Sequence, residues 1–440
     1  MEKAEQFPKR KRFNKVEWSW IFYDWANSIW ATNIAAAIFP IYFTMKATDT
    51  GNAIYGYAVS IANLLIALLA PYLGAIGDFR GMKKKLWAGF LILGVVFTAF
   101  MGIFGTWQMM LIGFIFARIG FSGSNLFYDS FLTDVTTPDR MDKVSTWGYA
   151  MGYIGGSTIP FVISIAIMLL MHQSDLSYRI AILIVPVWWF LFSIPFFKNV
   201  KQIHSVDTPP AQLGKTAWKN VGHTFISILK NKAILFFILA YFFYIDGVST
   251  IINMATNYGS TLGLGTIGMI LALLVTQIVA MPFSIFFGKW SKKYGALTLI
   301  GIAVGIYALI TIIGFLMGFL VDFYDSLGIA YETAISVSTV LFWVLATLVG
   351  TVQGGIQALS RSYFGQLIPP ERSNEYYGFL DIFGKFAAVI GPALYALVFH
   401  LTYKPSFGIL SIILLFIVGG AFLLIGRPYF RKVEHEAVEE

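Results

Sequence analysis

The chain contains no cysteine among its 440 residues and only five histidines. The absence of cysteine excludes disulfide bonds, thiolate zinc sites, iron–sulfur clusters and a cysteine nucleophile. The few histidines leave little for metal binding, so we expect no metal site and no cofactor. The sequence also lacks a phosphate-binding loop, a dinucleotide fingerprint and a nucleophile elbow. We therefore expect neither an enzyme nor a pump that hydrolyses ATP on this chain.

Charged residues are scarce as well. They make up 12% of the chain, whereas hydrophobic residues make up 57% and the mean hydropathy is +0.71. A soluble domain carries about 25% charged residues and cannot enclose so many apolar side chains under so little polar cover. The composition therefore predicts an all-α membrane protein. The net charge of +8 indicates contact with anionic lipid headgroups rather than with nucleic acid.

Twelve apolar runs are long enough to cross a bilayer core of about 30 Å, which takes about 20 residues per helix. The predicted spans are 18–45, 54–77, 86–105, 107–132, 145–171, 179–198, 233–258, 263–288, 296–320, 333–362, 376–400 and 406–426. The first run is longer than the core of a signal peptide, so we expect a retained span. The longest polar break predicts six-helix bundles at 18–198 and 233–426, joined by a central loop at 199–232 and flanked by tails at 1–17 and 427–440.

The basic residues predict the orientation in the membrane. Of the 31 Lys and Arg residues, only Lys46, Arg179 and Lys404 fall in loops on one side, and Arg118 and Lys385 fall within spans. The others fall in the tails, the central loop, and the loops or helix ends on the side of the tails. Loops rich in Lys and Arg stay in the cytoplasm. We therefore expect both termini and the central loop to be cytoplasmic, in the plasma membrane of a bacterial cell.

Two stretches of the second half repeat the first half. The loop Gly74–Lys83, between spans 2 and 3, aligns through two glycines with Gly288–Gly295, between spans 8 and 9. Pro138-Asp139-Arg140, before span 5, matches Pro370-Glu371-Arg372, before span 11. Transporters are often built from such duplications.

These features carry a resemblance. Twelve spans in two related halves, with the Gly74–Lys83 loop between spans 2 and 3, resemble the major facilitator superfamily and its signature loop. The stretches Tyr23–Ser28 and Gln353–Ser362 resemble the vacuole-effluxer-like branch, which is related to the autophagy-associated amino-acid exporters of fungal vacuoles. The resemblance implies the major facilitator fold, with twelve transmembrane helices in two pseudo-symmetric six-helix bundles.

The resemblance also implies a cytoplasmic gate formed by the two related loops. The expected gate residues are Gly74, Asp78, Gly81 and Lys83 in the first loop and Gly288 and Gly295 in the second. The sequence departs from the signature at Phe79 and Met82, where basic residues are usual. It departs again at Lys292, where the second copy would carry Asp. The gate assignment therefore rests more on the first half.

Polar residues recur at helical spacing in spans 1, 4, 7 and 10, the spans that line the central cavity in the superfamily. In span 4, Arg118, Asn125 and Asp129 share one helical face. An ionisable side chain at bilayer depth costs several kcal/mol unless it meets protein or water. The candidates for substrate binding or coupling are Asp24, Asn27, Ser28, Arg118, Asn125, Asp129, Asp246, Asn253, Gln353, Gln357 and Lys385.

Depth along each helix, at about 1.5 Å per residue, divides the charged candidates into two groups. Arg118, Asp246 and Lys385 are expected near the midplane as contacts for a substrate or a proton. We expect Arg118 and Asp246 to belong to one central site. The shallower charged residues, expected to act as a gate or an anchor, are Asp24, Asp129, Arg361 and Asp381.

Structural roles compete with these assignments. Asp381 and Lys385 lie one helical turn apart and could simply neutralise each other. Asp24 could accept hydrogen bonds at the cytoplasmic end of its helix. Asn125, Asn253 and Gln357 could form hydrogen bonds between helices instead of binding a ligand.

The leading functional hypothesis is a secondary transporter that moves a small polar solute of amino-acid type by alternating access, with proton coupling left open. Charges of both signs near the midplane suit the carboxylate and the ammonium of a zwitterion. A membrane receptor or scaffold without transport activity, and a lipid-moving flippase of the same fold, are the alternatives. The expected partners are a small-molecule substrate, membrane lipids and, if transport is coupled, protons. We expect a monomer that binds no nucleic acid.

Overall fold

The computed structural model describes the backbone of residues 12–207 and 209–439, and their side chains except those at 49, 50, 52, 53, 266, 267, 270, 387, 388 and 434–439. The predicted tails therefore lie partly outside the described residues. Within the described ranges, twelve helices or joined helices are long and apolar enough to cross a membrane, which confirms the predicted number of spans. Spans in a bilayer become helical because intrahelical hydrogen bonds satisfy every backbone group where water is absent.

The first six spans contain two π-helical segments, labelled η1 and η2. The helices are α1 (Lys15–Ile29), η1 (Trp30–Ala36), α2 (Ile38–Lys46), α3 (Asp49–Gly77), α4 (Met82–Ile103), α5 (Trp107–Ser130), α6 (Leu132–Val135), α7 (Pro138–Met151), η2 (Gly152–Thr158), α8 (Ile159–Leu170) and α9 (Asp175–Asn199). The segments α1, η1 and α2 together form the first span, and α7, η2 and α8 form the fifth.

The last six spans follow a helix that is not a span. These helices are α10 (Leu213–Lys230), α11 (Lys232–Thr261), α12 (Thr266–Tyr294), α13 (Ala296–Asp322), α14 (Tyr331–Leu367), the 3₁₀ turn η3 (Pro370–Arg372), α15 (Ser373–Thr402), α16 (Pro405–Ser411) and α17 (Ile413–Glu439).

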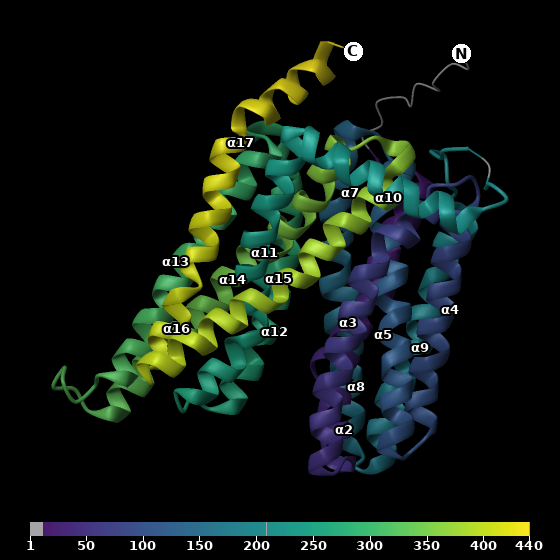
Figure 1. Ribbon diagram of the computed structural model, residues 1–440. Coiled ribbons are helices and arrows are strands. Elements are labelled where there is room, and N and C mark those ends of the chain that lie inside the picture. The colour runs from purple at the N-terminus through teal and green to yellow at the C-terminus, as the bar shows by residue number, and fades with distance from the viewer. Residues whose placement is uncertain (1–11, 208, 440) are drawn as a thin grey trace.

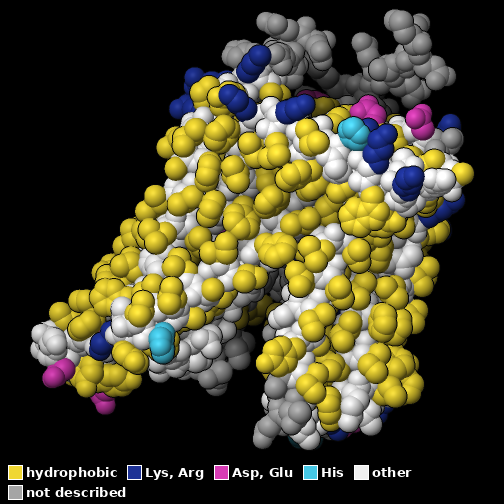
Figure 2. Space-filling view, in the orientation of Figure 1, with side chains coloured by type: hydrophobic (Ala, Val, Ile, Leu, Met, Phe, Trp, Pro, Cys, Tyr) yellow, Lys and Arg dark blue, Asp and Glu magenta, His cyan; other side chains and the backbone are white. Residues whose placement is uncertain are grey.

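The spans form two bundles that meet at one end of the molecule. Figure 1 shows α3, α4, α5 and α9 in one bundle and α11, α13, α14 and α17 in the other. We call the end where α1 begins and α17 ends the terminal face. The bundles touch near this face and diverge away from it. Figure 2 shows the molecular surface hollowed between them on the side opposite the terminal face.

Two segments differ from the sequence prediction. The predicted central loop 199–232 contains the helix α10, and the predicted C-terminal tail 427–440 continues the helix α17 as far as Glu439. Hydropathy detects apolar length, so it passes over an amphipathic helix such as α10, in which apolar and basic residues alternate around the axis. It also ends a span where the apolar run ends, whereas α17 continues through Pro428.

Candidate functional site

The closed end of the molecule is built around the loop between α3 and α4. Asp78 in this loop is 2% exposed and caps the N-terminus of α15. Its Oδ1 accepts hydrogen bonds from the backbone and side-chain nitrogens of Asn374, at 2.9 and 2.7 Å, and its Oδ2 accepts one from the backbone of Glu375, at 3.1 Å. An N-terminal helix end favours an acceptor of negative charge. Asp78 thus ties the first bundle to the second.

A buried lysine extends this contact. Lys83 at the start of α4 is fully buried, and its Nζ lies 2.7 Å from Asp134 and donates to Ser373 Oγ of the second bundle at 3.0 Å. Gly81 makes the turn possible, because its φ of +75° lies in the left-handed region. We call the contacts of Asp78 and Lys83 with residues 373–375 the terminal-face joint.

Asp78 and Asp134, the two carboxylates that interact with Lys83, have opposite shifts in pKa. Burial raises the pKa of Asp78 to about 7, although Lys83 and the hydrogen bonds from Asn374 and Glu375 oppose the rise. Burial alone would also raise the pKa of Asp134, but Lys83 and hydrogen bonds from His204 outweigh it and hold that pKa below its usual value. Lys83 therefore favours the ionised form of Asp134, whereas the pKa of Asp78 lies near neutral pH.

Small residues allow the bundles to approach so closely. A Cβ on Gly74 would overlap the backbone carbonyl of Asn374, and a Cβ on Gly378 would lie 2.7 Å from the carbonyl oxygen of Ala70. On the related side of the molecule, a Cβ on Gly288 of α12 would overlap Thr146 of α7. Gly295 ends α12 with a φ of +81°. The glycines expected at the gate thus lie at close approaches or at turns.

Arg361 of α14 enters the first bundle and binds two of its carboxylates. Its Nη1 lies 2.9 Å from Asp129 of α5, and its Nη2 lies 3.2 Å from Asp24 of α1. Its Nε donates to Ser145 Oγ at 2.9 Å, and the guanidinium carbon lies 4.6 Å from the centre of the Trp20 ring. Three helices of the first bundle therefore surround one side chain of the second.

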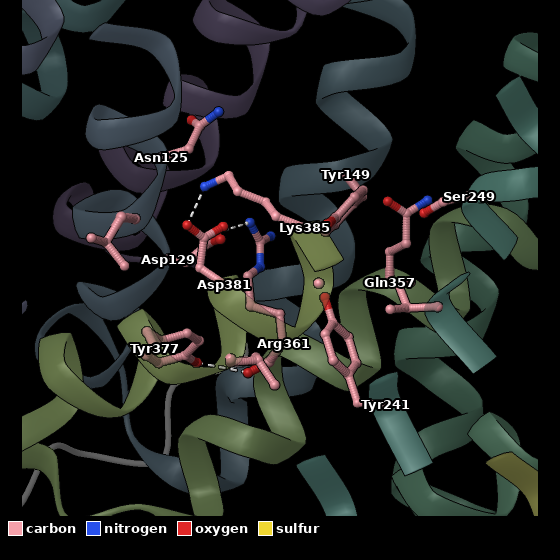
Figure 3. A pocket seen from close by; sticks show the side chains of 14 residues that line it. Asn125, Asp129, Tyr149, Tyr241, Ser249, Gln357, Arg361, Tyr377, Asp381 and Lys385 are labelled. Atoms are coloured by element: carbon pink, nitrogen blue, oxygen red, sulfur yellow. Dashed lines mark hydrogen bonds and ion pairs between the residues drawn. The ribbon is translucent and has the colours of Figure 1, made fainter. Parts of the chain in front are cut away.

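Next to Arg361 lies a cavity of about 270 Å³ between the bundles. Figure 3 shows charged side chains of both signs and three tyrosines pointing into it. Asp381 and Lys385 of α15 form an ion pair there, as their spacing suggested. The lining residues are Asn125, Leu126, Asp129, Tyr149, Tyr241, Ile245, Ser249, Gln357, Arg361, Tyr377, Leu380, Asp381, Gly384 and Lys385.

The charges around the cavity do not balance. The carboxylates of Asp24, Asp129 and Asp381 are held by the two cations Arg361 and Lys385, so the described group carries a net charge of −1 when all five are ionised. An excess of charge of one sign is costly in a site partly withdrawn from water. A bound ammonium group or a proton would complete the set.

The structure brings together residues that were expected to have different roles because of their different depths along the helices. Lys385, expected at the midplane, and Asp129, Arg361 and Asp381, expected at a gate, line one cavity. The reason is geometric: α15 packs against α5, and Arg361 of α14 reaches Asp24 and Asp129, so equal distances along two helices do not mean equal distance from the cavity. Asp24 does not line the cavity, but it forms an ion pair with Arg361, which does.

Other candidates lie around the cavity or away from it. Asn27 donates to Asn125 at 2.6 Å, and Ser28 packs against Gly152 and Gly156. Gln353 lines a separate, apolar pocket within the second bundle, and Asn253 is exposed. Neither Gln353 nor Asn253 lines the charged cavity.

Arg118 and Asp246, expected in one central site, each bind a partner in their own bundle. Arg118 Nε donates to Asn63 of α3 at 2.6 Å. Asp246 is 1% exposed and accepts from the backbone of Gly391 at 2.9 Å and from Thr250 at 3.3 Å. Neither residue lines the charged cavity.

Sequence reasoning missed the tyrosines of the cavity. Tyr377 lies one turn before Asp381 on α15, so extending the Asp381–Lys385 stripe backwards would have found it. Tyr149 lies in α7, for which no polar stripe was predicted. Tyr241 lies in α11, five residues before Asp246. No periodic signal marks them, and a tyrosine in a membrane protein is equally well explained by the enrichment of this residue at the membrane–water interfaces.

Comparison with known proteins finds relatives that cover most of the chain. Residues 133–427 match the model of the family described as "Vacuole effluxer Atg22 like". The chain is 41% identical over 423 residues to the MFS-type transporter YxiO of Bacillus subtilis, covering 93% of this chain and 94% of that protein. It is 28% identical over 290 residues to autophagy-related protein 22-1 of Aspergillus niger, covering 62% of this chain and 45% of the longer fungal protein.

A solved structure shares the fold at low sequence identity. A bacterial homologue of the iron transporter ferroportin, in an outward-facing state, superposes with a TM-score of 0.64 at 13% identity, covering 96% of this chain and 98% of that one. This likeness establishes the arrangement of the twelve helices and nothing about the solute.

Proposed function

Because the chain belongs to the vacuole effluxer Atg22-like family of major facilitator transporters, we propose that it carries a small zwitterion of amino-acid type through the cavity beside Arg361. The observation that carries the proposal is the mixed and unbalanced charge of that cavity. Its volume of about 270 Å³ is near the lower end of ligand pockets, roughly 300–1,000 Å³, which suits a small metabolite better than a lipid.

The ion pair of Asp381 and Lys385 gives the zwitterion a way to bind. Both side chains line the cavity and are partly exposed to it. A substrate ammonium can replace Lys385 at Asp381, while the substrate carboxylate takes the lysine ammonium, so no charge is left without a partner during the exchange. The remaining charge of −1 leaves room for a proton carried with the substrate.

Arg118 supplies a second proposed contact. It lies on the same face of α5 as Asn125 and Asp129, further from the terminal face, and the described residues offer it no carboxylate within ion-pair distance. We assign it to the carboxylate of a solute that passes between the cavity and the open cleft. Asp246 keeps its proposed role in proton coupling, as a buried carboxylate near the midplane.

The distribution of basic residues supports a cytoplasmic terminal face. With that orientation, in the plasma membrane of a bacterial cell, the terminal-face joint closes the path to the cytoplasm and the cleft faces outward. Alternating access then requires the joint to open and the bundles to close on the other side.

Uptake of labelled amino acids and other polar metabolites into proteoliposomes, with and without a proton gradient, tests this proposal. Lys385→Gln should raise KM for the transported solute roughly tenfold or more, since it removes a charged hydrogen bond to the substrate. Lys46→Gln is the matched control, because it removes a similar ion pair, with Asp175, outside the cavity. Arg118→Gln should also raise KM.

Three outcomes would overturn parts of the proposal. If no amino acid is transported while another solute is, the substrate class is wrong. If the double variant Asp381→Asn/Lys385→Gln transports with the wild-type KM, the pair is structural and the solute binds elsewhere. A transport rate independent of the proton gradient and of pH would remove proton coupling.

A further inference from the structure

The helix α10 has an apolar side that stays largely exposed among the described residues. Its buried face, formed by Ala217, Thr224 and Ile228, packs against the ends of the spans. One flank presents Trp218 and Leu229, which are 58% and 49% exposed. Large exposed apolar groups on an otherwise packed helix mark a contact with another apolar phase or molecule.

The other flank of α10 is basic. Lys215, Lys219 and Lys230 are all exposed and recur at spacings that place them on one side of the helix. The lysines lie opposite the buried face, and the apolar flank lies between the two. This arrangement, with Trp and Leu beside Lys, is typical of helices that lie in the interface of an anionic membrane.

The apolar flank continues the surface that faces the bilayer core. The Trp218 ring stacks on Tyr72 of α3 at 4.9 Å between centroids, and the Phe225 ring stacks on Phe379 of α15 at 6.1 Å. Below Tyr72 on α3, Leu68 and Leu69 are exposed in the membrane-spanning region. Figure 2 shows the apolar belt reaching a rim of Lys and Arg side chains at the level of α10.

We propose that α10 lies in the headgroup region of the leaflet at the terminal face, where its lysines bind anionic phospholipids, and that this contact holds the terminal-face joint closed. The partner is a lipid surface, because the exposed flank is continuous with the transmembrane belt and carries the charge that complements acidic headgroups. This inference needs only the membrane insertion of the chain and does not depend on the solute.

The contacts of the buried face connect the lipid surface to the joint. Thr224 of α10 accepts a hydrogen bond from Arg372 at 3.5 Å, and Arg372 directly precedes α15, whose first residues hold Asp78. α10 also packs along α3, which carries the Asp78 loop at its end. A helix fixed in the leaflet therefore clamps the ends of α3 and α15 together from outside.

The lipid contact can be measured with one fluorophore, since the chain has no cysteine of its own. Leu229→Cys, labelled with an environment-sensitive dye, is placed in nanodiscs of phosphatidylcholine alone or with phosphatidylglycerol. The emission should shift to the blue in the anionic discs. Lys215→Gln/Lys219→Gln/Lys230→Gln should abolish the shift, because each lysine contributes roughly fivefold to partitioning on an anionic surface. The matched control, Lys85→Gln/Lys198→Gln/Lys201→Gln, removes three exposed lysines of the same face and should keep it.

The effect on the joint is read at the other end of the molecule. Spin labels on Met45→Cys and Leu401→Cys, which are exposed at the far ends of the two bundles, report how widely the cleft is open. Phosphatidylglycerol should increase the fraction of molecules with a long distance between the two spin labels, that is, with an open cleft. We expect this increase in wild type and in the control triple variant, but not in the α10 triple variant. The proposal would be overturned if the dye had the same emission in both bilayers, or if the control triple variant lost the blue shift as fully as the α10 triple variant. It would also be overturned if the distance distribution in wild type were the same with and without phosphatidylglycerol.

Discussion

Arg361 illustrates how much one residue can decide in this protein. Its guanidinium meets Asp24, Asp129 and Ser145 at once, which requires a planar fork with several fixed donors. A lysine at this position would carry the same charge on a single nitrogen and could not reach all three partners. The same side chain closes the contact between the bundles and forms one wall of the cavity, so the contact and the proposed binding site share a residue.

Asp78 gives the joint a dependence on pH. Its pKa is about 7 in the closed joint, whereas a carboxylate exposed to water in an open joint has a pKa of about 4. The closed state therefore binds the proton more tightly between these values. Acidification from above pH 7 should favour closure, by up to tenfold per pH unit, and raising the pH should weaken it.

Asp78→Asn tests this assignment, because the amide stays neutral at every pH. The variant should lose the pH dependence of the distance across the cleft between about pH 5 and 7, measured by spin labels. Transport should slow, while expression and KM stay close to wild type, since Asp78 lies outside the cavity. A pH dependence equal to that of wild type would show that another group titrates.

At the scale of elements, the contact of α3 with α15 sets how closely the bundles approach. The two helices meet at Gly74 and Gly378, where each lies against the backbone of the other helix. Backbone atoms cannot move aside as a flexible side chain can. The close approach is also what allows the Asp78 carboxylate to reach the N-terminus of α15.

Gly74→Ala should therefore weaken the joint. The added methyl would overlap Asn374 and lie 2.8 Å from Glu375 Cα, and overpacking of this kind costs about 1–3 kcal/mol. We expect slower transport and a smaller fraction of molecules with an open cleft, measured by the spin-label distances. Gly89→Ala on α4 is the control, since its Cβ would meet nothing within 4 Å. It should transport like wild type; a similar defect there would point to a general effect on helix flexibility.

At the scale of the whole molecule, the bundles are joined at the terminal face and separated at the other end. Orientation in the membrane then decides which compartment the cleft faces. The chain contains no cysteine, so single introduced cysteines can be labelled without a background. A reagent that cannot cross the membrane should reach Tyr403→Cys, at the end of α15, and miss Lys85→Cys and Lys292→Cys. Labelling of Lys292→Cys in intact cells would refute the cytoplasmic position of the terminal face.

The sequence by itself determined the elements and their polar faces. The length of the apolar runs predicted twelve spans because the bilayer fixes how many residues a helix needs. The helical period placed Asn125 and Asp129 on one face of α5 and paired Asp381 with Lys385 on α15, because spacing within one helix is set by its geometry. The glycines of the two related loops were expected at a gate from the resemblance, and the structure places them at turns and close approaches.

Only the tertiary structure decided which faces meet. The pair of Arg361 with Asp24 joins residues 337 positions apart, and the capping of α15 by Asp78 joins residues 296 apart. Such contacts depend on how the helices tilt and rotate against one another, which their periodicity does not fix. For the same reason Arg118 and Asp246, both expected near the midplane, bind partners in separate bundles, whereas Lys385 and the shallower charges line one cavity.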